Sequence, residues 1–396
     1  MKKFLFIFLL LCSIHFWGLS FLPRQFHYIT DTVSLLIMGF AFISTLGQDK
    51  LRFRNAIIVF FAGIVVNIVA AYLYHGQRII DTFLIFGSFY FILFYFSLHQ
   101  LRIERKYLEN MIIIFAVVYS VFYLVQFYAY PLEIVESQMK VDRGTIRLRI
   151  IGNGFLVLAY FMLLNRYMMK QKWTNMILLG FFFIILLKGG FRTLTIMTVV
   201  LTIMMYIKLA RYSKNHLLTV ILAIVLLAGL AQSRSTSAII KNMIYTTTEQ
   251  IDQGDEYIRL KQLDFFINNY MEKGLYYVTG GGFPAGEGNY NQKMRFFQEQ
   301  YGFYWVDLGI LGFYFVIGAL ALTGMLWYAL KAAFIKLRPE YSYLNFYFLY
   351  LILVSFTTME IYRAGVFAVE ALVLYLIDIS KDEADEQSGN NQVYTI

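Results

Sequence analysis

The sequence predicts an all-α polytopic membrane protein with about twelve transmembrane helices, both termini in the cytoplasm, and one large external loop with an amphipathic helix. The first supporting observation is composition, because 59% of the 396 residues are hydrophobic, 19% are aromatic and 15% are charged. A soluble domain is typically about 45–50% apolar and about 25% charged. The mean hydropathy of +0.60 therefore excludes a soluble globular enzyme and a disordered chain. One cysteine excludes a disulfide framework and a cysteine-based zinc site.

The second observation is a series of apolar runs of membrane-spanning length. A hydrocarbon core about 30 Å thick requires about 20 mostly apolar residues in a helix. Twelve such runs lie near 4–22, 29–47, 55–74, 81–99, 110–130, 150–165, 174–188, 193–209, 216–231, 303–330, 344–358 and 364–379. Two of them are short, so the predicted number ranges from eleven to thirteen. The first run lacks a small-residue cleavage site, so it is interpreted as a span and not as a signal peptide.

The third observation is the distribution of positive charge between the runs. With a cytoplasmic start, each predicted inside connection carries three cations, whereas the outside connections after the first, third and eleventh spans carry only Arg24, Arg78 and Arg363. The inside cations are Lys50, Arg52, Arg54, Arg102, Arg105, Lys106, Arg166, Lys170, Lys172, Lys208, Arg211, Lys214, Lys331, Lys336 and Arg338. This positive-inside asymmetry orients the chain. It also accounts for the net charge of +9 without nucleic-acid binding.

The same pattern predicts the domain organisation. Transmembrane helices occupy residues 1–231, a large periplasmic or external loop occupies 232–302, further helices occupy 303–380, and an acidic cytoplasmic tail occupies 381–396. Within the loop, apolar residues recur at helical spacing after Asp255, which is a suitable N-cap residue. We therefore expect an amphipathic helix there that lies along the membrane or caps the helix bundle.

Six arginines on the predicted outer side are candidate ligands for an anion. A charge kept at the rim of a membrane bundle is costly and often functional, although a single arginine can also reach the lipid headgroups. Arginine binds phosphate oxygens through two parallel hydrogen bonds. Six such residues on the disfavoured side thus favour a shared phosphate or pyrophosphate. They are Arg147, Arg149, Arg192, Arg259, Arg295 and Arg363.

A glycine-rich segment and a few carboxylates complete the candidates. Gly280, Gly281 and Gly282 either form a flexible turn that returns the loop to the bundle or present bare backbone N–H groups to a sugar or phosphate. Asp307 and Glu287 are the candidate bases toward a sugar hydroxyl. Glu360 precedes Arg363 by three residues, a spacing that favours an ion pair over catalysis. No metal cluster is evident.

Four segments, in this order, resemble the O-antigen ligase/polymerase superfamily of polytopic proteins. Residues 147–153 (RLRIIGN) are similar to its arginine-rich entry to a middle span, and residues 189–193 (GGFRT) to its turn before the next helix. Arg259 followed by GGGF at 280–283 is similar to the arginine and glycine pattern of its outer loop. Residues 307–312 (DLGILG) are similar to its acidic helix start.

The resemblance implies a polymerase that transfers a polyprenyl-pyrophosphate-linked glycan onto the non-reducing end of an incoming lipid-linked repeat unit. It implies a bacterial inner membrane with the site on the periplasmic face, no cofactor, and a chain-length regulator and a flippase as partners besides membrane lipids. Ligases of this superfamily carry a His-Asn pair after the glycine turn. Residues 288–306 contain Asn289 and Asn291 but no histidine, which favours the polymerase.

Alternative functions stay open at this point. One is an O-antigen ligase that transfers glycan to a lipid core, and another is a transporter or flippase of the lipid-linked oligosaccharide. Transporters often contain inverted repeats and broken helices, whereas this sequence shows no internal duplication. A different lipid-linked glycosyltransferase would need an acidic pair near the first outer loop, where residues 23–31 offer only Asp31. The sequence therefore favours an enzyme over a transporter.

Overall fold

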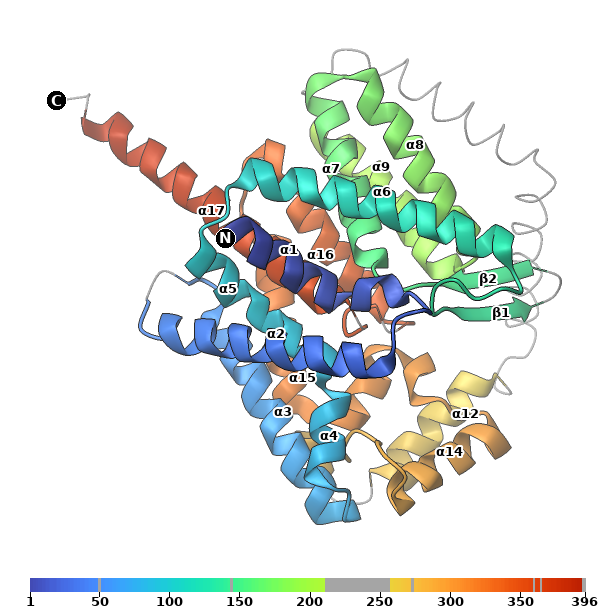
Figure 1. Cartoon of the computed structure of the whole chain (residues 1–396). Helices are drawn as coiled ribbons and strands as arrows, with labels where there is room; N and C mark the ends of the chain where they lie inside the picture. The colour runs from blue at the N-terminus through green and yellow to red at the C-terminus, as the bar shows by residue number, and fades with distance from the viewer. Residues whose placement is uncertain are drawn as a thin grey trace.

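The computed structural model describes residues 1–48, 51–142, 145–210, 257–271, 274–358, 360–363 and 365–393. In these residues the chain is helical apart from one β-hairpin (Figure 1). The N-terminal helical elements are α1 (Lys2–Ser13), η1 (His15–Gly18), α2 (Arg24–Thr45), α3 (Arg54–His75), α4 (Ile79–Ile85), η2 (Gly87–Leu93), α5 (Phe94–Leu101) and α6 (Arg105–Ala129). The hairpin strands are β1 (Gln138–Asp142) and β2 (Thr145–Arg149), and helices α7 (Asn153–Lys170), α8 (Trp173–Lys188) and α9 (Arg192–Leu209) follow.

The described C-terminal half begins with α12 (Ile258–Phe265), which continues into η5 (Phe266–Tyr270). It continues with α13 (Tyr276–Thr279), α14 (Asn289–Tyr301), η6 (Trp305–Leu308), α15 (Ile310–Phe334), η7 (Pro339–Tyr341), α16 (Ser342–Ser355) and α17 (Val366–Val393). The hairpin, α12 and α14 lie at the opposite end of the helix array from the last turns of α17 (Figure 1). The helix expected after Asp255 is present from Ile258, and Asp255 itself lies outside the described residues.

Several helices have the length and composition of membrane spans. In the described residues five qualify, namely α2 from Gln25, α3, α6, α9 and α15, and the pair α4 and Gly87–Leu101 would be a sixth despite a 60° bend. Large hydrophobic side chains on these helices face outward, with Ile43 70% and Ile207 69% exposed. Apolar surface of this extent is typical of a protein in contact with lipid. The chain is thus a helical, multi-pass membrane protein.

The number of spans and their orientation stay predictions. Each predicted apolar run other than 216–231 coincides with a helix or a pair of helices, and 216–231 lies outside the described residues. However, α1, α8 and α16 contain 12, 16 and 14 residues, and at about 1.5 Å per residue they are too short to cross a bilayer alone.

Three of the predicted runs differ from the helices in the structure. The first run, 4–22, is not one helix, because α1 ends at Ser13 and the backbone φ is positive from residue 15 to 18. The run 81–99 bends by 60° between α4 and η2. The run 303–330 starts as a helix only at Ile310, because Gly309 has a φ of 57° that a continuous right-handed helix excludes.

The structure also differs from the purely helical prediction in the segment 131–149, which contains the β-hairpin. Strands β1 and β2 pair antiparallel, with Gln138 opposite Arg149 and Lys140 opposite Arg147. The stretch TIRLR of β2 alternates apolar and charged residues, which is the period of a strand and not of a helix. The hairpin therefore ends at Arg149, four residues before the first residue of α7, Asn153.

The helices α3 and α15 approach each other through glycines. A Cβ atom built on Gly63 would lie 2.3 Å from the backbone nitrogen of Ala321, and one on Gly324 would lie 2.2 Å from that of Phe60. Small residues at such a crossing allow close backbone contact, which is a main source of helix association in membranes. Residues 279–282 pack against these two helices, so the contact between the helices fixes the surface that this segment covers.

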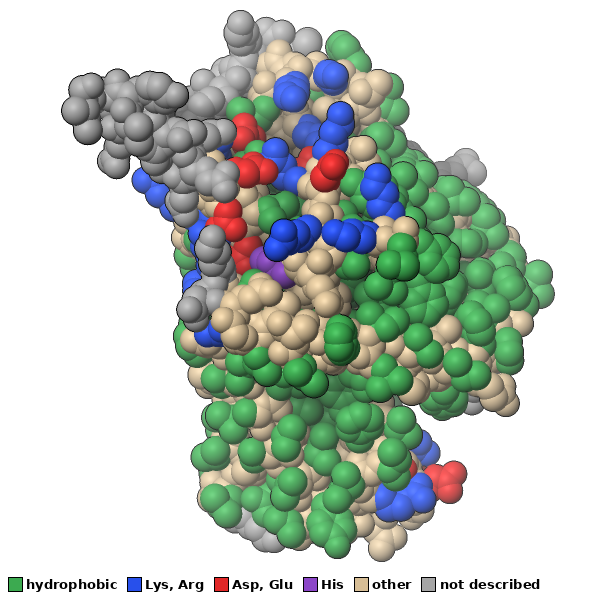
Figure 2. Space-filling view, turned by 60° about the vertical axis from the view of Figure 1, so that its left-hand side comes forward, with side chains coloured by type: hydrophobic (Ala, Val, Ile, Leu, Met, Phe, Trp, Pro, Cys, Tyr) green, Lys and Arg blue, Asp and Glu red, His purple; other side chains and the backbone are tan. Residues whose placement is uncertain are grey.

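Charged side chains gather at the ends of several helices near α17. Glu109 accepts a 2.6 Å hydrogen bond from Arg166 and one of 2.9 Å from Tyr343, while the buried Asp378 lies 3.2 Å from His99 and accepts a hydrogen bond from Tyr95. Figure 2 shows most charged side chains of this face, of both signs, together in its upper part and a smaller group at its lower right, with largely hydrophobic surface between them. Charges confined to the ends of apolar helices are expected where a bilayer ends.

Candidate functional site

Two of the six candidate arginines meet at one buried carboxylate. Nη2 of Arg149 lies 2.7 Å from Oε1 of Glu360, and Nη1 of Arg363 lies 2.9 Å from the same oxygen. The side chain of Glu360 is 2% exposed, whereas each arginine side chain is 18% exposed. Two cations and one carboxylate leave one net positive charge. The three residues form what we term the arginine pair site.

The local structure explains how these residues converge. Arg149 is the last residue of β2, so the hairpin delivers it to the start of α7. Glu360 and Arg363 come from the connection between α16 and α17, where Ile361 donates a backbone hydrogen bond to the hydroxyl of Ser355. The guanidinium of Arg149 also lies 3.9 Å from the ring centroid of Phe191, just before α9. A stacked, hydrogen-bonded guanidinium is held in one orientation.

A small cavity borders this site, and two helices begin at it. It has a volume of about 30 Å³, room for about one water molecule. The cavity is lined by Arg149, by Asn153 at the first turn of α7, and by Phe191 and Leu194 beside the start of α9. The other lining residues are Tyr119, Tyr123, Leu148, Leu156, Ile185, Leu186 and Gly189. A helix N-terminus carries a partial positive charge and unpaired N–H groups, so it attracts anions. Arg149 of the arginine pair site therefore lies beside the first turns of two helices, and the last turn of α8 lines the same cavity.

The charge state of the site is set by burial and by the carboxylate. Burial lowers the pKa of Arg363 to about 10, and Glu360 opposes this shift. Arg363 consequently stays protonated at neutral pH. A buried ion trio of this kind is costly to assemble and strongly destabilised when one partner is removed. An arginine has five N–H donors, so contact with Glu360 leaves donors of both residues for an incoming anion.

Asp307 is the acidic candidate that lies closest to this site. It is exposed in η6, and its charge acts on Tyr362, the residue between Ile361 and Arg363. Burial, Asp307 and Glu360, in that order, raise the pKa of Tyr362. The hydroxyl of Tyr362 donates to the carbonyl oxygen of Gly309 at 2.6 Å, which ties η6 to the α16–α17 connection. Asp307 and Glu360 thus both act on the hydroxyl of Tyr362.

Glu287, the other candidate base, lies elsewhere. It is exposed, and it acts electrostatically on Arg78, which pairs with Asp81 at 2.8 Å near the start of α4. Gly286 is close to the same group, because a Cβ on it would lie 2.5 Å from Oδ2 of Asp81. The structure therefore associates Glu287 with the loop between α3 and α4, whereas Asp307 acts on Tyr362, the neighbour of Arg363.

The glycine segment packs into a break in α15. Gly318 has φ 79° and ψ 173°, so the helix is interrupted and the carbonyls of the preceding turn lack their usual donors. The N–H groups of Gly281 and Gly282 donate to Phe315 and Val316 at 2.9 and 3.0 Å. Asn67 of α3 adds hydrogen bonds of 2.7 and 2.8 Å to the carbonyl oxygens of Thr279 and Val316.

This packing bears on the two interpretations of the glycines. The N–H of Gly280 donates to Tyr276 at 2.8 Å, so all three glycine N–H groups have protein acceptors. A Cβ on Gly280 would lie 2.2 Å from the carbonyl oxygen of Val316, which explains why the segment needs glycine. In this structure the segment therefore returns the loop to the bundle and does not offer its backbone N–H groups to a ligand.

The remaining arginines are dispersed. Arg192 is the first residue of α9, next to Phe191, and is half-buried. Arg259 on α12 and Arg295 on α14 make no hydrogen bond or ion pair with the arginine pair site within the described residues, and Arg295 is exposed. Arg147 lies on β2, and its side chain is outside the described part.

Sequence reasoning missed the aromatic contribution to this site. Tyr119, Tyr123 and Phe191 line the cavity, but in a chain with 31 tyrosines and 39 phenylalanines they carry no distinguishing pattern. The sequence pointed to the turn 189–193 through Arg192 and through its resemblance to the superfamily's turn. Phe191, one residue earlier, is the side chain that contacts Arg149.

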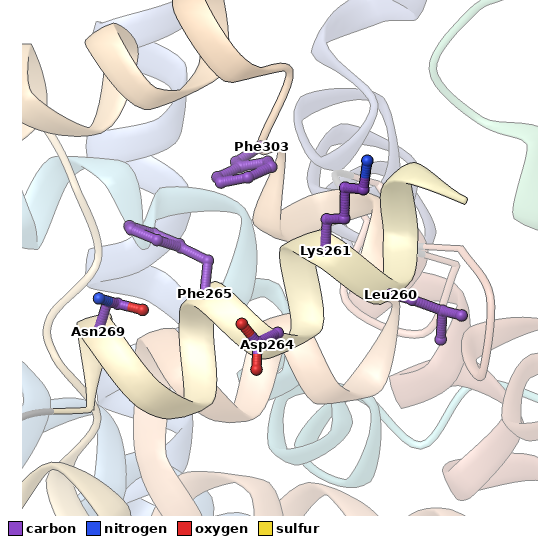
Figure 3. Close-up of a pocket in the computed structure, with 6 residues that line it drawn as sticks. All are labelled: Leu260, Lys261, Asp264, Phe265, Asn269 and Phe303. Carbon is purple, nitrogen blue, oxygen red and sulfur yellow. The ribbon is translucent and has the colours of Figure 1, made fainter. Parts of the chain in front are cut away.

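A second, larger depression lies on the long loop. Its volume is about 520 Å³, and its walls are Leu260, Lys261, Asp264, Phe265, Asn269 and Phe303 (Figure 3). We call it the α12 cleft. It is formed by α12, the following η5 turn and the segment before η6. Among the described residues, no group of three or more His, Cys, Asp or Glu side chains is arranged to hold a metal ion.

Comparisons with known proteins add no identification. No protein-family model matches the sequence, and no curated protein matches it significantly.

Proposed function

We propose that this protein is a glycosyltransferase that polymerises a polysaccharide on the outer face of a bacterial inner membrane. The donor is a polyprenyl-pyrophosphate-linked glycan, and the acceptor is the non-reducing end of an incoming lipid-linked repeat unit. The observation that carries the proposal is that Arg149, which shares the carboxylate of Glu360 with Arg363, also lines a cavity beside the first turns of α7 and α9. This arrangement suits a pyrophosphate. The order of the four segments that resemble the O-antigen ligase/polymerase superfamily supports it.

In the proposed reaction, the oxygen of the acceptor hydroxyl attacks the anomeric carbon of the donor glycan. The bond from that carbon to the pyrophosphate oxygen breaks, and the polyprenyl pyrophosphate leaves with the bonding electrons. Arg149 and Arg363 stabilise the negative charge that develops on the leaving group. Asp307 accepts the hydroxyl proton. The departing pyrophosphate supplies the driving force, so a nucleotide is not required.

In this scheme Glu360 holds both guanidinium groups in position before the donor arrives. The cavity of about 30 Å³ is too small for a sugar ring, so the pyrophosphate would contact the exposed side of the arginines.

Conservative replacements of the two arginines test their role, because lysine keeps the charge but loses the bidentate geometry. Arg149→Lys and Arg363→Lys should abolish long polymer at unchanged protein level. Arg78→Lys, at a 74% exposed side chain, is the matched control and should leave it intact.

A deletion strain separates this function from its alternatives. A lost polymerase leaves single repeat units on the lipid carrier or the acceptor, because flipping and capping continue. A lost ligase leaves long polymer on the polyprenyl lipid, and a lost flippase leaves single units facing the cytoplasm. We expect one-repeat products and no ladder of longer chains. Purified protein should build the ladder from lipid-linked repeats alone. Long lipid-linked chains in the deletion strain would refute the polymerase in favour of the ligase.

A further inference from the structure

We infer that the α12 cleft binds the sugar rings of the glycan substrate. This inference rests on the proposed function and identifies where the glycan, as opposed to the pyrophosphate, is held. The cleft volume of about 520 Å³ falls within the range of about 300–1,000 Å³ that is typical of small-molecule sites. By comparison, the cavity at the arginine pair site is far too small for this task.

The lining of the cleft has the two kinds of groups that carbohydrate recognition requires. Phe265 and Phe303 are neighbouring rings among its lining residues (Figure 3), and aromatic faces attract the weakly positive C–H bonds on the apolar face of a sugar ring. Lys261 supplies donors, Asp264 supplies acceptors, and the amide of Asn269 supplies both. A sugar hydroxyl is a donor and an acceptor at once, so this mixture matches it.

The aromatic wall is held in place before any ligand binds. The ring of Phe265 lies 4.6 Å from that of Phe297 and 5.2 Å from that of Phe303, measured between centroids. The buried Gln262 donates a 2.6 Å hydrogen bond to the carbonyl of Gly302, which fixes the segment that carries Phe303. Such preorganisation lowers the entropic cost of binding.

The polar groups are likewise oriented, and their charges argue against other ligands. Asn268 donates a 2.6 Å hydrogen bond to Oδ1 of Asp264, which leaves the second carboxylate oxygen available to the cleft. Lys261 and Asp264 give one charge of each sign, so the cleft favours neither a phosphate nor a cation. Both side chains are exposed. A neutral, hydroxyl-rich ligand is the class that this lining suits.

Binding to a lipid-free oligosaccharide tests the cleft directly. The probe is the oligosaccharide of two repeat units released by mild acid from the host's own surface polysaccharide, added to the full-length protein in nanodiscs. Saturation-transfer NMR should detect contact with the wild-type protein. Phe303→Leu should weaken binding about tenfold, and Asn269→Ala should weaken it about fivefold. Phe303→Tyr should retain wild-type binding because tyrosine keeps the aromatic face. Phe296→Leu, at an exposed ring on α14 outside the cleft, should change it less than twofold.

Each outcome decides the inference. No binding by the wild-type protein at millimolar oligosaccharide would overturn it, and so would equal binding by Phe303→Leu. A nitroxide spin label can also be attached to the variant Asn269→Cys. If oxygen dissolved in the lipid relaxes this label more than an aqueous nickel chelate does, the cleft lies in lipid, and the inference is overturned. The polymer ladder in cells is scored separately. Glycan binding without a ladder defect in the deletion strain keeps the cleft and removes the polymerase, whereas a ladder defect without glycan binding does the reverse.

Discussion

Replacement of Glu360 by glutamine tests the electrostatic logic of the arginine pair site. Glutamine has nearly the same shape but no charge, so Arg149 and Arg363 would face each other across a site where the central side chain is 2% exposed. Removal of one partner of a buried ion pair costs about 3–5 kcal/mol. Because both arginines keep 18% of their side-chain surface exposed and can be partly hydrated, we expect the lower end, about 3 kcal/mol.

This free energy converts to a measurable shift of the unfolding midpoint. For a large domain, each kcal/mol lowers the melting temperature by about 2 °C, so Glu360→Gln should lower it by about 6 °C. Cys12 is the single cysteine of the chain and is buried, so a thiol-reactive dye reports unfolding in detergent without further labelling. Glu299→Gln, at an exposed carboxylate on α14, is the control and should shift the midpoint by less than about 1 °C.

A double-mutant cycle then tests whether the loss of stability arises from the interaction between Glu360 and Arg363. If the loss arises from the uncompensated arginines, the variant Glu360→Gln with Arg363→Gln should be more stable than the sum of the single effects by about 1–3 kcal/mol. Additive effects would mean that Glu360 and Arg363 do not interact in the folded protein. An unchanged midpoint in Glu360→Gln would refute the buried ion trio itself.

Three further predictions follow from other parts of the structure. Gly318→Val should lower stability by at least about 3 kcal/mol, seen as a lower midpoint in the dye assay, because a Cβ would lie 2.2 Å from the backbone nitrogen of Gly280 at a φ and ψ that only glycine adopts readily. In a Cys12→Ser background, an impermeant maleimide should label Asn289→Cys from outside intact cells but not Lys172→Cys; labelling of both or the reverse pattern would contradict the proposed orientation. Asp307→Asn should slow polymerisation of lipid-linked repeats by about 100-fold or more at unchanged protein level, and a normal rate would exclude this residue as the base.

The sequence singled out the three residues of the arginine pair site and one of its two ion pairs. Arg149 and Arg363 were candidates because guanidinium groups at helix ends are costly, and Glu360 was expected to pair with Arg363 because the two are three residues apart. The pairing of Glu360 with Arg149 could not be predicted, because it joins residues 211 positions apart. Arg259 and Arg295 were candidates as arginines of the predicted outer loop, yet α12 and α14 place them without a hydrogen bond or ion pair to this trio in the described residues.

Composition, apolar runs and charge distribution by themselves determined the class of this protein, because lipid contact requires long stretches of hydrophobic side chains and charges at their ends. They did not determine where helices break. The break at Gly318 exists because residues 279–282 fill it and satisfy the exposed carbonyls, and no local pattern encodes a partner from another segment. The two helix N-termini that meet Arg149, and the cleft between α12 and Phe303, likewise arise only when distant segments pack together. Tertiary structure decided them, because an anion or sugar site depends on side-chain distances that chain order leaves open.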